Sequence, residues 1–225
     1  MRPILTDEEV AAFRGDVCRV AEMLFARHGV EGVTMRQIAA ELGCSSTTAY
    51  RYFQNKDEIL TAVRASAFNR FCEVIEDATR SSPDARKSAR NVGQAYLAFA
   101  LGNPDAYRMM FDVGPAAATG NAEVSEALAR ARRAMVAYLA PLIDSGILRG
   151  DAYALGQMLW ASAHGLVMLR LSGIVADDIE LRQLHETTMS AIVRGANQAI
   201  AVSGSTGIPQ PVSRSPARKA GRKTP

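Results

Sequence analysis

Apolar residues recur every three to four positions along most of the chain, which is the spacing of one face of an α-helix. No segment shows the sustained alternation of β-branched and polar residues that is typical of a strand. The first apolar stripe, from Phe13 to Phe25, follows a capping-box pattern made by Thr6 and Glu9 and ends near Gly29. The pattern predicts an all-α chain of about nine helices, at about residues 7–28, 35–42, 46–53, 56–80, 83–101, 104–112, 122–145, 151–172 and 177–201.

Capping residues mark the starts of several of these helices. Asn55 with Glu58 matches a cap ahead of the long helix at 56–80. Ser82 and Asn103 each precede a proline, a residue that favours the first position of a helix. We therefore expect helices to begin at both prolines.

Two short helices between residues 34 and 53 have the signals of a helix-turn-helix. Thr34 and the glutamine three residues later form a second capping box. Gly43 suits the left-handed conformation that ends the first short helix, and Ser45 or Ser46 can cap the second. The small Ala39 permits a close crossing of the two.

The two faces of this helix pair differ in chemistry. Ile38, Leu42, Ala49 and Phe53 are expected to pack onto the flanking helices. The opposite face of the second helix is then free to enter a major groove, and it carries Ser46, Thr47, Thr48, Arg51 and Tyr52. A generic helical hairpin has similar spacing, so periodicity alone does not decide between the two.

The residues from Ala21 to Leu60 resemble the N-terminal DNA-binding domain of the tetracycline-repressor (TetR) family. The matching positions are Leu24-Phe25, Gly29, Thr34, Ile38-Ala39, Gly43, Tyr50, Phe53, Lys56 and Leu60. Family members often have a basic residue or glycine early in the recognition helix, where this chain has Ser45-Ser46-Thr47-Thr48, so base preference does not follow. The resemblance implies a homodimeric regulator, by default a repressor, that leaves a palindromic double-stranded DNA operator when a small-molecule effector binds. A transcriptional activator of the same fold is the alternative.

Candidate DNA contacts follow from this resemblance and from residue chemistry. Thr34 caps its helix and, in the family pattern, also touches a phosphate. Lys56 is unfavourable beside the positive end of a helix, so a phosphate partner explains it better. Tyr50 and Tyr52 are either core aromatics or phosphate contacts, with Tyr52 expected to point outward, and Arg51 suits a guanine edge or a phosphate. The candidates are Thr34, Arg36, Ser45, Ser46, Thr47, Thr48, Tyr50, Arg51, Tyr52 and Lys56.

The helix at 151–172 is apolar on two opposite sides, so both sides must be buried. One side can face the chain's own core and the other a second subunit, and the sequence does not say which is which. The family resemblance implies dimerisation through the last two helices, as a four-helix bundle across a two-fold axis. The interface candidates are Leu155, Leu159, Leu166, Met189, Ile192, Val193 and Ala196.

The segments Leu159–Leu169 and Asn103–Phe111 resemble a subgroup of the family whose effector domain is named for a Trp-His-Gly signature. Trp160 and His164 lie one turn apart on one helix face. They either pack in the core, with a hydrogen-bonded histidine, or line a cavity for a largely apolar effector. The cavity candidates are Tyr96, Phe99, Tyr107, Met110, Phe111, Trp160, His164 and Met168.

The net charge of +3 has an uneven source. Residues 1–60 carry seven basic and nine acidic side chains, residues 61–202 are balanced, and residues 203–225 carry five basic side chains and no acidic one. We expect a DNA-binding domain at 1–60, an effector and dimerisation domain at 61–202, and a disordered basic tail at 203–225. The tail is either a solvated extension or, in a rival hypothesis, the basis of non-specific DNA binding.

Several other classes are disfavoured. The apolar charge-free stretch at 152–169 reaches only the lower limit of a bilayer span and contains polar residues, so a buried helix is expected, with no membrane association. Acidic residues stand where a signal peptide would have its apolar run, which favours a cytoplasmic protein. No catalytic motif or metal-ligand spacing occurs, so we expect no enzyme, metal or cofactor. The cysteines, expected to be reduced and two of them in the core, are Cys18, Cys44 and Cys72.

Overall fold

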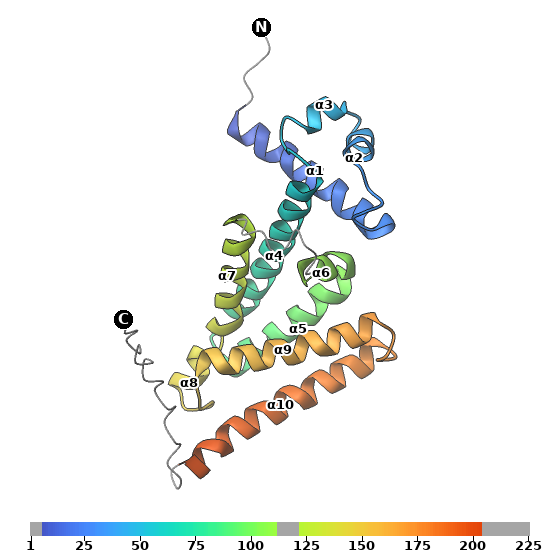
Figure 1. Cartoon of the computed structure of the whole chain (residues 1–225). Helices are drawn as coiled ribbons and strands as arrows, with labels where there is room; N and C mark the ends of the chain where they lie inside the picture. Colours follow the sequence, from blue (N-terminus) through green and yellow to red (C-terminus); the bar gives the residue numbers. More distant parts are fainter. Residues whose placement is uncertain (1–5, 112–121, 204–225) are drawn as a thin grey trace, which may run out of the picture.

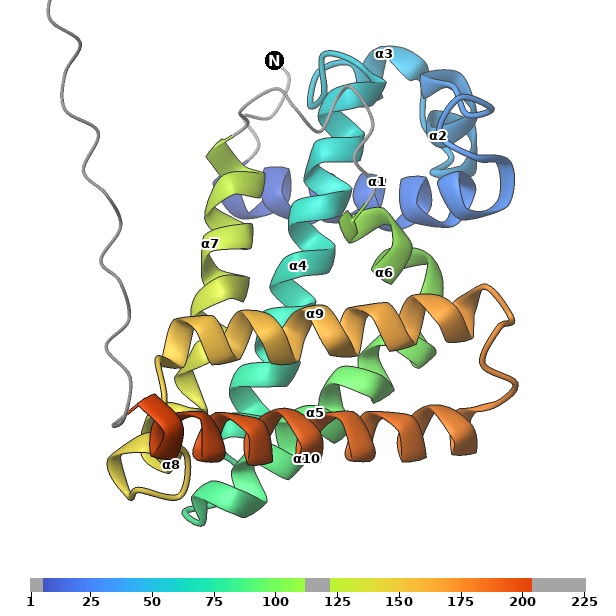
Figure 2. The same cartoon turned by 60° about the horizontal axis from the view of Figure 1, so that its bottom comes forward.

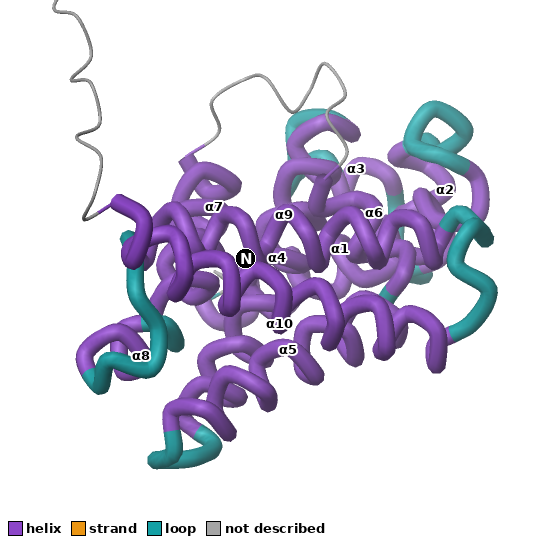
Figure 3. Tube along the Cα trace, turned by 90° about the horizontal axis from the view of Figure 1, so that it is seen from below, coloured by secondary structure: helices purple, strands orange, loops and turns teal. Residues whose placement is uncertain are grey.

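The computed structural model describes residues 6–111 and 122–203 (Figure 1). Within these ranges the chain forms helices and loops and no strand, which confirms the all-α prediction (Figure 3). The helices are α1 (Asp7–His28), α2 (Met35–Glu41), α3 (Ser46–Ala49), α4 (Lys56–Arg80), α5 (Ala85–Gly102), α6 (Pro104–Phe111), α7 (Ala122–Ala137), α8 (Ala140–Asp144), α9 (Ala152–Leu171) and α10 (Asp178–Ser203).

Side-chain caps fix where most of these helices begin. Both predicted capping boxes are present, at Thr6 and at Thr34, and Asn55 caps α4 as predicted. The predicted start of α5 is wrong by two residues, because Asp84 rather than Ser82 accepts the hydrogen bond from a first-turn N–H. A carboxylate and a hydroxyl compete as caps there, and the carboxylate also gains from the positive end of the helix.

Two predicted helices differ in extent. The second short helix ends at Ala49 as α3, and single turns continue the chain to Phe53. The helix predicted at 122–145 is divided into α7 and α8, with Pro141 at the start of α8. A proline lacks the N–H that a continuous helix needs, which accounts for the break. The loop expected near 114–121 and the tail expected at 203–225 lie outside the described residues, apart from Ser203.

The helices form two packed units that share α4 (Figures 1 and 2). We call residues 6–63 the head and residues 64–203 the body. The buried core of the head joins α1, α2 and α3 to the first two turns of α4, through Val63. The core of the body begins at Ala65 on the same helix and includes α5, α6, α7 and α9. The change of core therefore falls within a continuous helix, close to the boundary expected at residue 60.

The body presents α9 and α10 side by side along one face (Figure 2). On the opposite side α4 packs against α7, α5 and α6.

Among the cysteines, Cys18 and Cys72 are buried and unpaired, and burial raises the pKa of both thiols to about 11. The expectation that two of the cysteines lie in the core is confirmed.

Candidate functional site

The helix pair α2–α3 is held from below by buried apolar side chains. Ile38, Ala49 and Phe53 are at most 1% exposed and pack in the core of the head, and Leu42 is half-buried against it. The guanidinium of Arg14 lies 4.1 Å from the centre of the Phe53 ring, which adds a cation–π contact from α1. These contacts are the ones predicted for a helix-turn-helix.

The turn between α2 and α3 has the geometry that its sequence predicts. Gly43 has φ +67°, the left-handed conformation that costs a side-chain-bearing residue free energy. The backbone N–H of Cys44 donates to the carbonyl of Ala39 at 2.9 Å and closes the end of α2. Ser45 then caps α3 by accepting from the N–H of Thr48. This turn fixes the angle at which α3 leaves α2.

The outer face of α2 and α3 is exposed and polar. Arg36, Ser45, Thr47, Tyr50 and Arg51 are all exposed, while the candidates Ser46 and Thr48 are half-buried. No ion pair or side-chain hydrogen bond links Arg36 or Arg51 to another described residue. The guanidinium groups of Arg36 and Arg51 are therefore free donors. They belong to the α2–α3 region, which forms the tip of the head (Figure 1).

The expected orientation of the two tyrosines is wrong. Tyr50 is 54% exposed, whereas Tyr52 is half-buried with its ring 4.4 Å from that of Phe13. The reason is that α3 ends at Ala49, so helical periodicity does not extend to Tyr52. The chain turns there, and Arg14 donates to the Tyr52 carbonyl. Tyr50 is therefore the tyrosine that a partner molecule can reach.

Two predicted phosphate contacts have partners within the chain. The Lys56 ammonium donates to the Val30 carbonyl at 2.7 Å and lies 3.6 Å from a Glu31 carboxylate oxygen. Its position beside a positive helix end is thus offset by the loop that follows α1. Thr34 is exposed, but its hydroxyl is engaged by Gln37 in the capping box. Contact with a phosphate stays a prediction for both residues.

The body has a cavity between α5, α8, α9 and α10. Seven of the eight residues predicted to line an effector cavity lie outside it. Tyr96, Tyr107 and His164 form a hydrogen-bonded chain, with 2.6 Å between the two hydroxyls and 2.8 Å from Tyr107 to His164 Nδ1. Phe111 packs between these rings, 4.2 Å from His164 and 6.3 Å from Trp160. Phe99 and Met110 are also buried in this core, and Met168 is 38% exposed. The packing alternative, with a hydrogen-bonded histidine, describes this cluster.

Burial sets the protonation state of the three hydrogen-bonded side chains, Tyr96, Tyr107 and His164. It lowers the pKa of His164, and it raises the pKa of Tyr96 and of Tyr107 far above the ordinary value. All three groups are therefore neutral near pH 7. The buried indole N–H of Trp160 has no complete hydrogen bond with a described residue, although it is close enough to Tyr96 to lower that hydroxyl's pKa.

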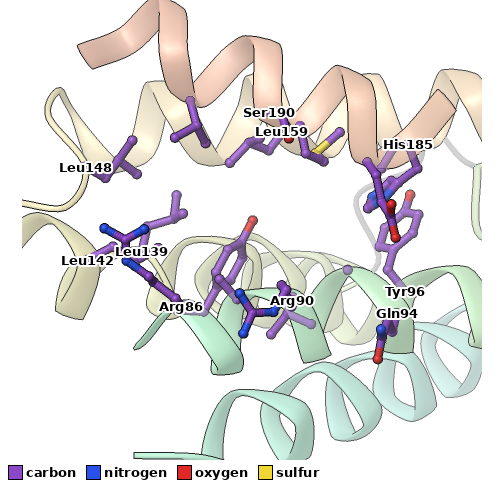
Figure 4. A pocket seen from close by; sticks show the side chains of 18 of the residues that line it. Arg86, Arg90, Gln94, Tyr96, Leu139, Leu142, Leu148, Leu159, His185 and Ser190 are labelled. Carbon is purple, nitrogen blue, oxygen red and sulfur yellow. The ribbon is translucent and has the colours of Figure 1, made fainter. Parts of the chain in front are cut away.

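The cavity of the body lies on the other side of Tyr96, between α5, α8, α9 and α10 (Figure 4). Its volume is about 590 Å³, within the range of small-molecule sites. Of the predicted effector residues only Tyr96 lines it. Sequence reasoning missed the polar part of the lining, although the spacing of Arg86, Arg90 and Gln94 on one helix face was visible. The lining polar residues are Arg86, Arg90, Gln94, Tyr96, Tyr138, Arg182, His185, Glu186 and Ser190.

The structure places the predicted dimer residues against the chain's own core, and contact with a second subunit stays a prediction for them. Leu155 and Leu159 are 6% exposed in the chain's own core, and Leu159 also lines the cavity with Met189 and Val193. Leu166, Ile192 and Ala196 are half-buried against the same core. These residues face inward because α9 and α10 cover the cavity and pack on each other. The outer face of the pair instead exposes apolar and small residues, namely Met158, Ala161, Gly165, Met168, Leu169, Leu184, Ala191 and Gly195.

A helix-turn-helix head on a helical body with a ligand-sized cavity defines a class of regulatory protein. Two family models match the chain: the tetR family of bacterial regulatory proteins over residues 18–63, and the tetracyclin repressor-like C-terminal domain over residues 89–192. Together they cover two thirds of the sequence. The chain belongs to the TetR family of bacterial regulatory proteins, as the resemblance predicted. The Trp-His-Gly subgroup stays a prediction.

Curated relatives match over part of their length. The chain is 27% identical over 75 residues to the transcriptional repressor AcnR of Corynebacterium diphtheriae, which is 33% of this chain and 40% of that one. It is 32% identical over 95 residues to the nucleoid occlusion factor SlmA of Pasteurella multocida, covering 40% and 46%. It is 26% identical over 99 residues to the transcriptional activator FasR of Mycolicibacterium smegmatis, covering 44% and 45%. The matches span less than half of each relative.

Solved structures share the fold over most of the chain. A protein of unknown function from Rhodococcus sp. RHA1 has a TM-score of 0.71 at 24% identity, covering 82% of this chain and 95% of that one. The regulator FadR from Bacillus subtilis, solved in complex with stearoyl-CoA, has a TM-score of 0.68 at 19% identity, covering 80% and 98%. These similarities show a common fold.

Two further properties concern the described residues alone. No helix among them is both long and apolar enough to cross a membrane. Their histidine, cysteine and carboxylate side chains form no group of three or more that could hold a metal ion.

Proposed function

We propose that this chain is a dimeric, ligand-responsive DNA-binding transcription regulator that acts in the cytoplasm as a repressor and leaves a palindromic operator when an effector binds. The observation that carries the proposal is the exposed face of α2 and α3, whose free donors stand on a rigid, buried support. Membership of a regulatory family supports a binding protein rather than an enzyme. Activation by the same fold is the second candidate, because FasR is a named activator among the relatives.

Recognition of DNA would divide between specific and positioning contacts. Thr47 on α3 and Arg51 in the turn after it are exposed, and side chains at such positions reach base edges in a major groove. Tyr50 and Arg36 would contact the flanking phosphates. The negative balance of residues 1–60 means that binding depends on this local donor set rather than on overall charge.

A second copy of the chain would cover the exposed face of α9 and α10. Gly165 and Gly195 have open space at their Cβ positions, so two such helix pairs can approach closely. Leu169 and Met158, 40% and 52% exposed, supply apolar contacts beside them. A two-fold axis through this face would set two heads about 34 Å apart, the repeat of successive major grooves.

Helix α6 connects the cavity to the head. Tyr96 lines the cavity and hydrogen-bonds Tyr107 of α6, whereas Met109 on the same helix packs in the core of the head. A guanidinium nitrogen of Arg64, on α4, lies 3.3 Å from the Met110 carbonyl and donates to it. Arg70 of α4 also makes a two-oxygen ion pair with Glu22 of α1. An effector that displaces Tyr96 would therefore shift α6 and α4 against the head.

Footprinting on DNA upstream of the chain's own coding region tests the proposal. The full chain is expected to protect a palindromic site at moderate salt. Arg51→Ala is expected to weaken protection by about tenfold to a hundredfold, the usual value of a specific arginine contact. Arg132→Ala, which removes an exposed arginine of α7 in the body, is the matched control and should leave protection unchanged. Equal losses in the two variants would contradict the assignment of the head.

A further inference from the structure

A large part of the cavity lining is apolar. The walls of this part come from the end of α7, from α8 and the loop after it, and from the inner faces of α9 and α10 (Figure 4). The aliphatic residues in this part are Leu139, Leu142, Leu148, Leu159, Met189 and Val193. Burying a hydrocarbon against such a surface stabilises the complex by roughly 0.8 kcal/mol for each CH₂ group.

Two polar side chains are set into these walls without protein partners. Tyr138 is 7% exposed and His185 is 8% exposed, and neither makes a hydrogen bond with a described residue. Burial lowers the pKa of His185 and raises that of Tyr138, so both are neutral near pH 7. The His185 ring lies close against α5 at Gly93. A Cβ atom added at this glycine would be only 2.9 Å from the Cε1 atom of the ring. Buried polar groups are normally satisfied, so these two are available to a ligand oxygen.

The exposed part of the cavity lining carries positive charge. Arg86 and Arg90 lie one turn apart on α5, Arg182 lies on α10, and Glu186 is the one acidic residue of the lining. None of the three guanidinium groups forms an ion pair or side-chain hydrogen bond with a described residue. Figure 4 shows Arg86 extending from α5 towards Leu139 and Leu142.

Helix stability does not explain these arginines. Arg86 lies in the first turn of α5, where the helix dipole is already positive, and Arg90 is a like charge one turn further on. The nearby carboxylate of Asp84 is used as the cap of the helix, accepting from the Lys87 N–H at 2.9 Å. That hydrogen bond lowers the pKa of Asp84, and the charges of Arg90 and Arg86 lower it further, so Asp84 balances part of their charge. It forms no ion pair with either guanidinium, which leaves both groups available to an anion.

We propose that this cavity binds an amphipathic organic anion, with its carboxylate or phosphate group at Arg86 and Arg90 and its hydrocarbon body among the leucines. An oxygen further along the ligand would meet Tyr138 and His185. The assignment rests on the proposed function, since this anion would be the effector. It replaces the expectation of a largely apolar effector with a molecule that has one charged end.

Calorimetry on the full chain without DNA tests the assignment with probes of one chain length. Decanoate and decyl phosphate carry the two anionic groups, and decanol carries the same hydrocarbon with a neutral group. We expect at least one anion to bind about tenfold or more tighter than decanol, since hydrogen bonds to charged groups are stronger than neutral ones. The tighter of the two anions identifies the preferred head group.

Two double variants locate the anion. Arg86→Gln with Arg90→Gln should weaken binding of the preferred anion by about tenfold and leave decanol unchanged. Lys87→Gln with Arg194→Gln removes the same amount of charge, one unit from α5 and one from α10, without touching the lining, and should change anion binding less than twofold. Equal losses in the two double variants, decanol binding as tightly as both anions, or no binding of any probe would overturn the proposal.

The outcome separates this inference from the function on which it rests. A chain that protects an operator but binds neither anion would refute the ligand class and leave the regulator proposal standing. A chain that binds decanoate through Arg86 and Arg90 but protects no operator would refute the regulator proposal and leave the ligand site standing.

Discussion

Removing one hydroxyl from the buried chain Tyr96–Tyr107–His164 should destabilise the body strongly. Tyr107 is fully buried and makes both hydrogen bonds of the chain, at 2.6 and 2.8 Å. Tyr107→Phe loses both bonds, worth about 0.5–1.5 kcal/mol each, and leaves the Tyr96 hydroxyl buried without a complete hydrogen bond, which adds about 1–3 kcal/mol. We expect a total loss of about 2–6 kcal/mol in the free energy of unfolding, a large part of the stability of a typical domain.

The matched control is Tyr138→Phe. Tyr138 is also a buried tyrosine of the body, but its hydroxyl has no hydrogen-bond partner among the described residues. Its loss should therefore change stability by less than about 0.5 kcal/mol. Tyr96→Phe should lie between the two, near 1 kcal/mol, because Tyr107 keeps its bond to His164.

Urea unfolding followed by the fluorescence of Trp160 measures these differences. Trp160 is the single tryptophan of the chain and is 8% exposed, so unfolding changes its surroundings completely. The transition midpoint should shift at constant slope. The double variant Tyr96→Phe with Tyr107→Phe should lose less than the sum of the single variants, since neither hydroxyl is then stranded. Similar losses for Tyr107→Phe and Tyr138→Phe would refute the reasoning.

Three other predictions concern the turn, the buried histidine and the outer face of α9. Gly43→Ala should lower stability by about 1 kcal/mol, because the added Cβ has open space and only the backbone conformation at φ +67° is penalised. Gly15→Ala, at an open helical position in α1, should instead be neutral or stabilising. Urea unfolding compares the two variants. The pKa of His185 is lowered by burial, so the unfolded chain takes up its proton first as the pH falls below about 6.5. Stability should then decline towards pH 5.5, by at most about 1.4 kcal/mol per pH unit from this group, with a shallower decline in His185→Gln, and an unchanged decline would contradict the assignment. Leu169→Asp should yield monomers in sedimentation velocity, whereas Val74→Asp, at a similarly exposed apolar position on α4, should not; two dimeric variants would refute the proposed interface.

Local signals in the sequence were sufficient for the helix-turn-helix. The caps at Thr6, Thr34 and Asn55 and the left-handed Gly43 depend on hydrogen bonds or backbone angles within a few residues, so their types and spacing determine them. The orientation of Tyr52 could not be predicted in the same way. It depends on where α3 ends and on contact with Phe13, far away in the sequence.

The cavity was beyond the sequence because it depends on which helices meet. Leu159 lies on one of two apolar sides of α9, and periodicity alone does not say which side faces the chain's own core. Arg86 and Arg90 have the spacing of an ordinary solvated helix face, and they acquire a role only where α10 lies across from them. The sequence predicted that these aromatic residues lie together. Their rings pack against one another in the core of the body and do not line a cavity.

Sequence-specific DNA binding by a dimer whose heads have a fixed spacing can be measured directly. Fluorescence anisotropy at a single moderate salt concentration compares the full chain's affinity for its footprinted operator with that for a scrambled duplex and for an operator with five base pairs inserted between its half-sites. The operator should bind about a thousandfold or more tighter than the scrambled duplex. The insertion should abolish most of that difference, because it rotates one half-site to the opposite face of the DNA. Equal affinity for all three duplexes would contradict the account.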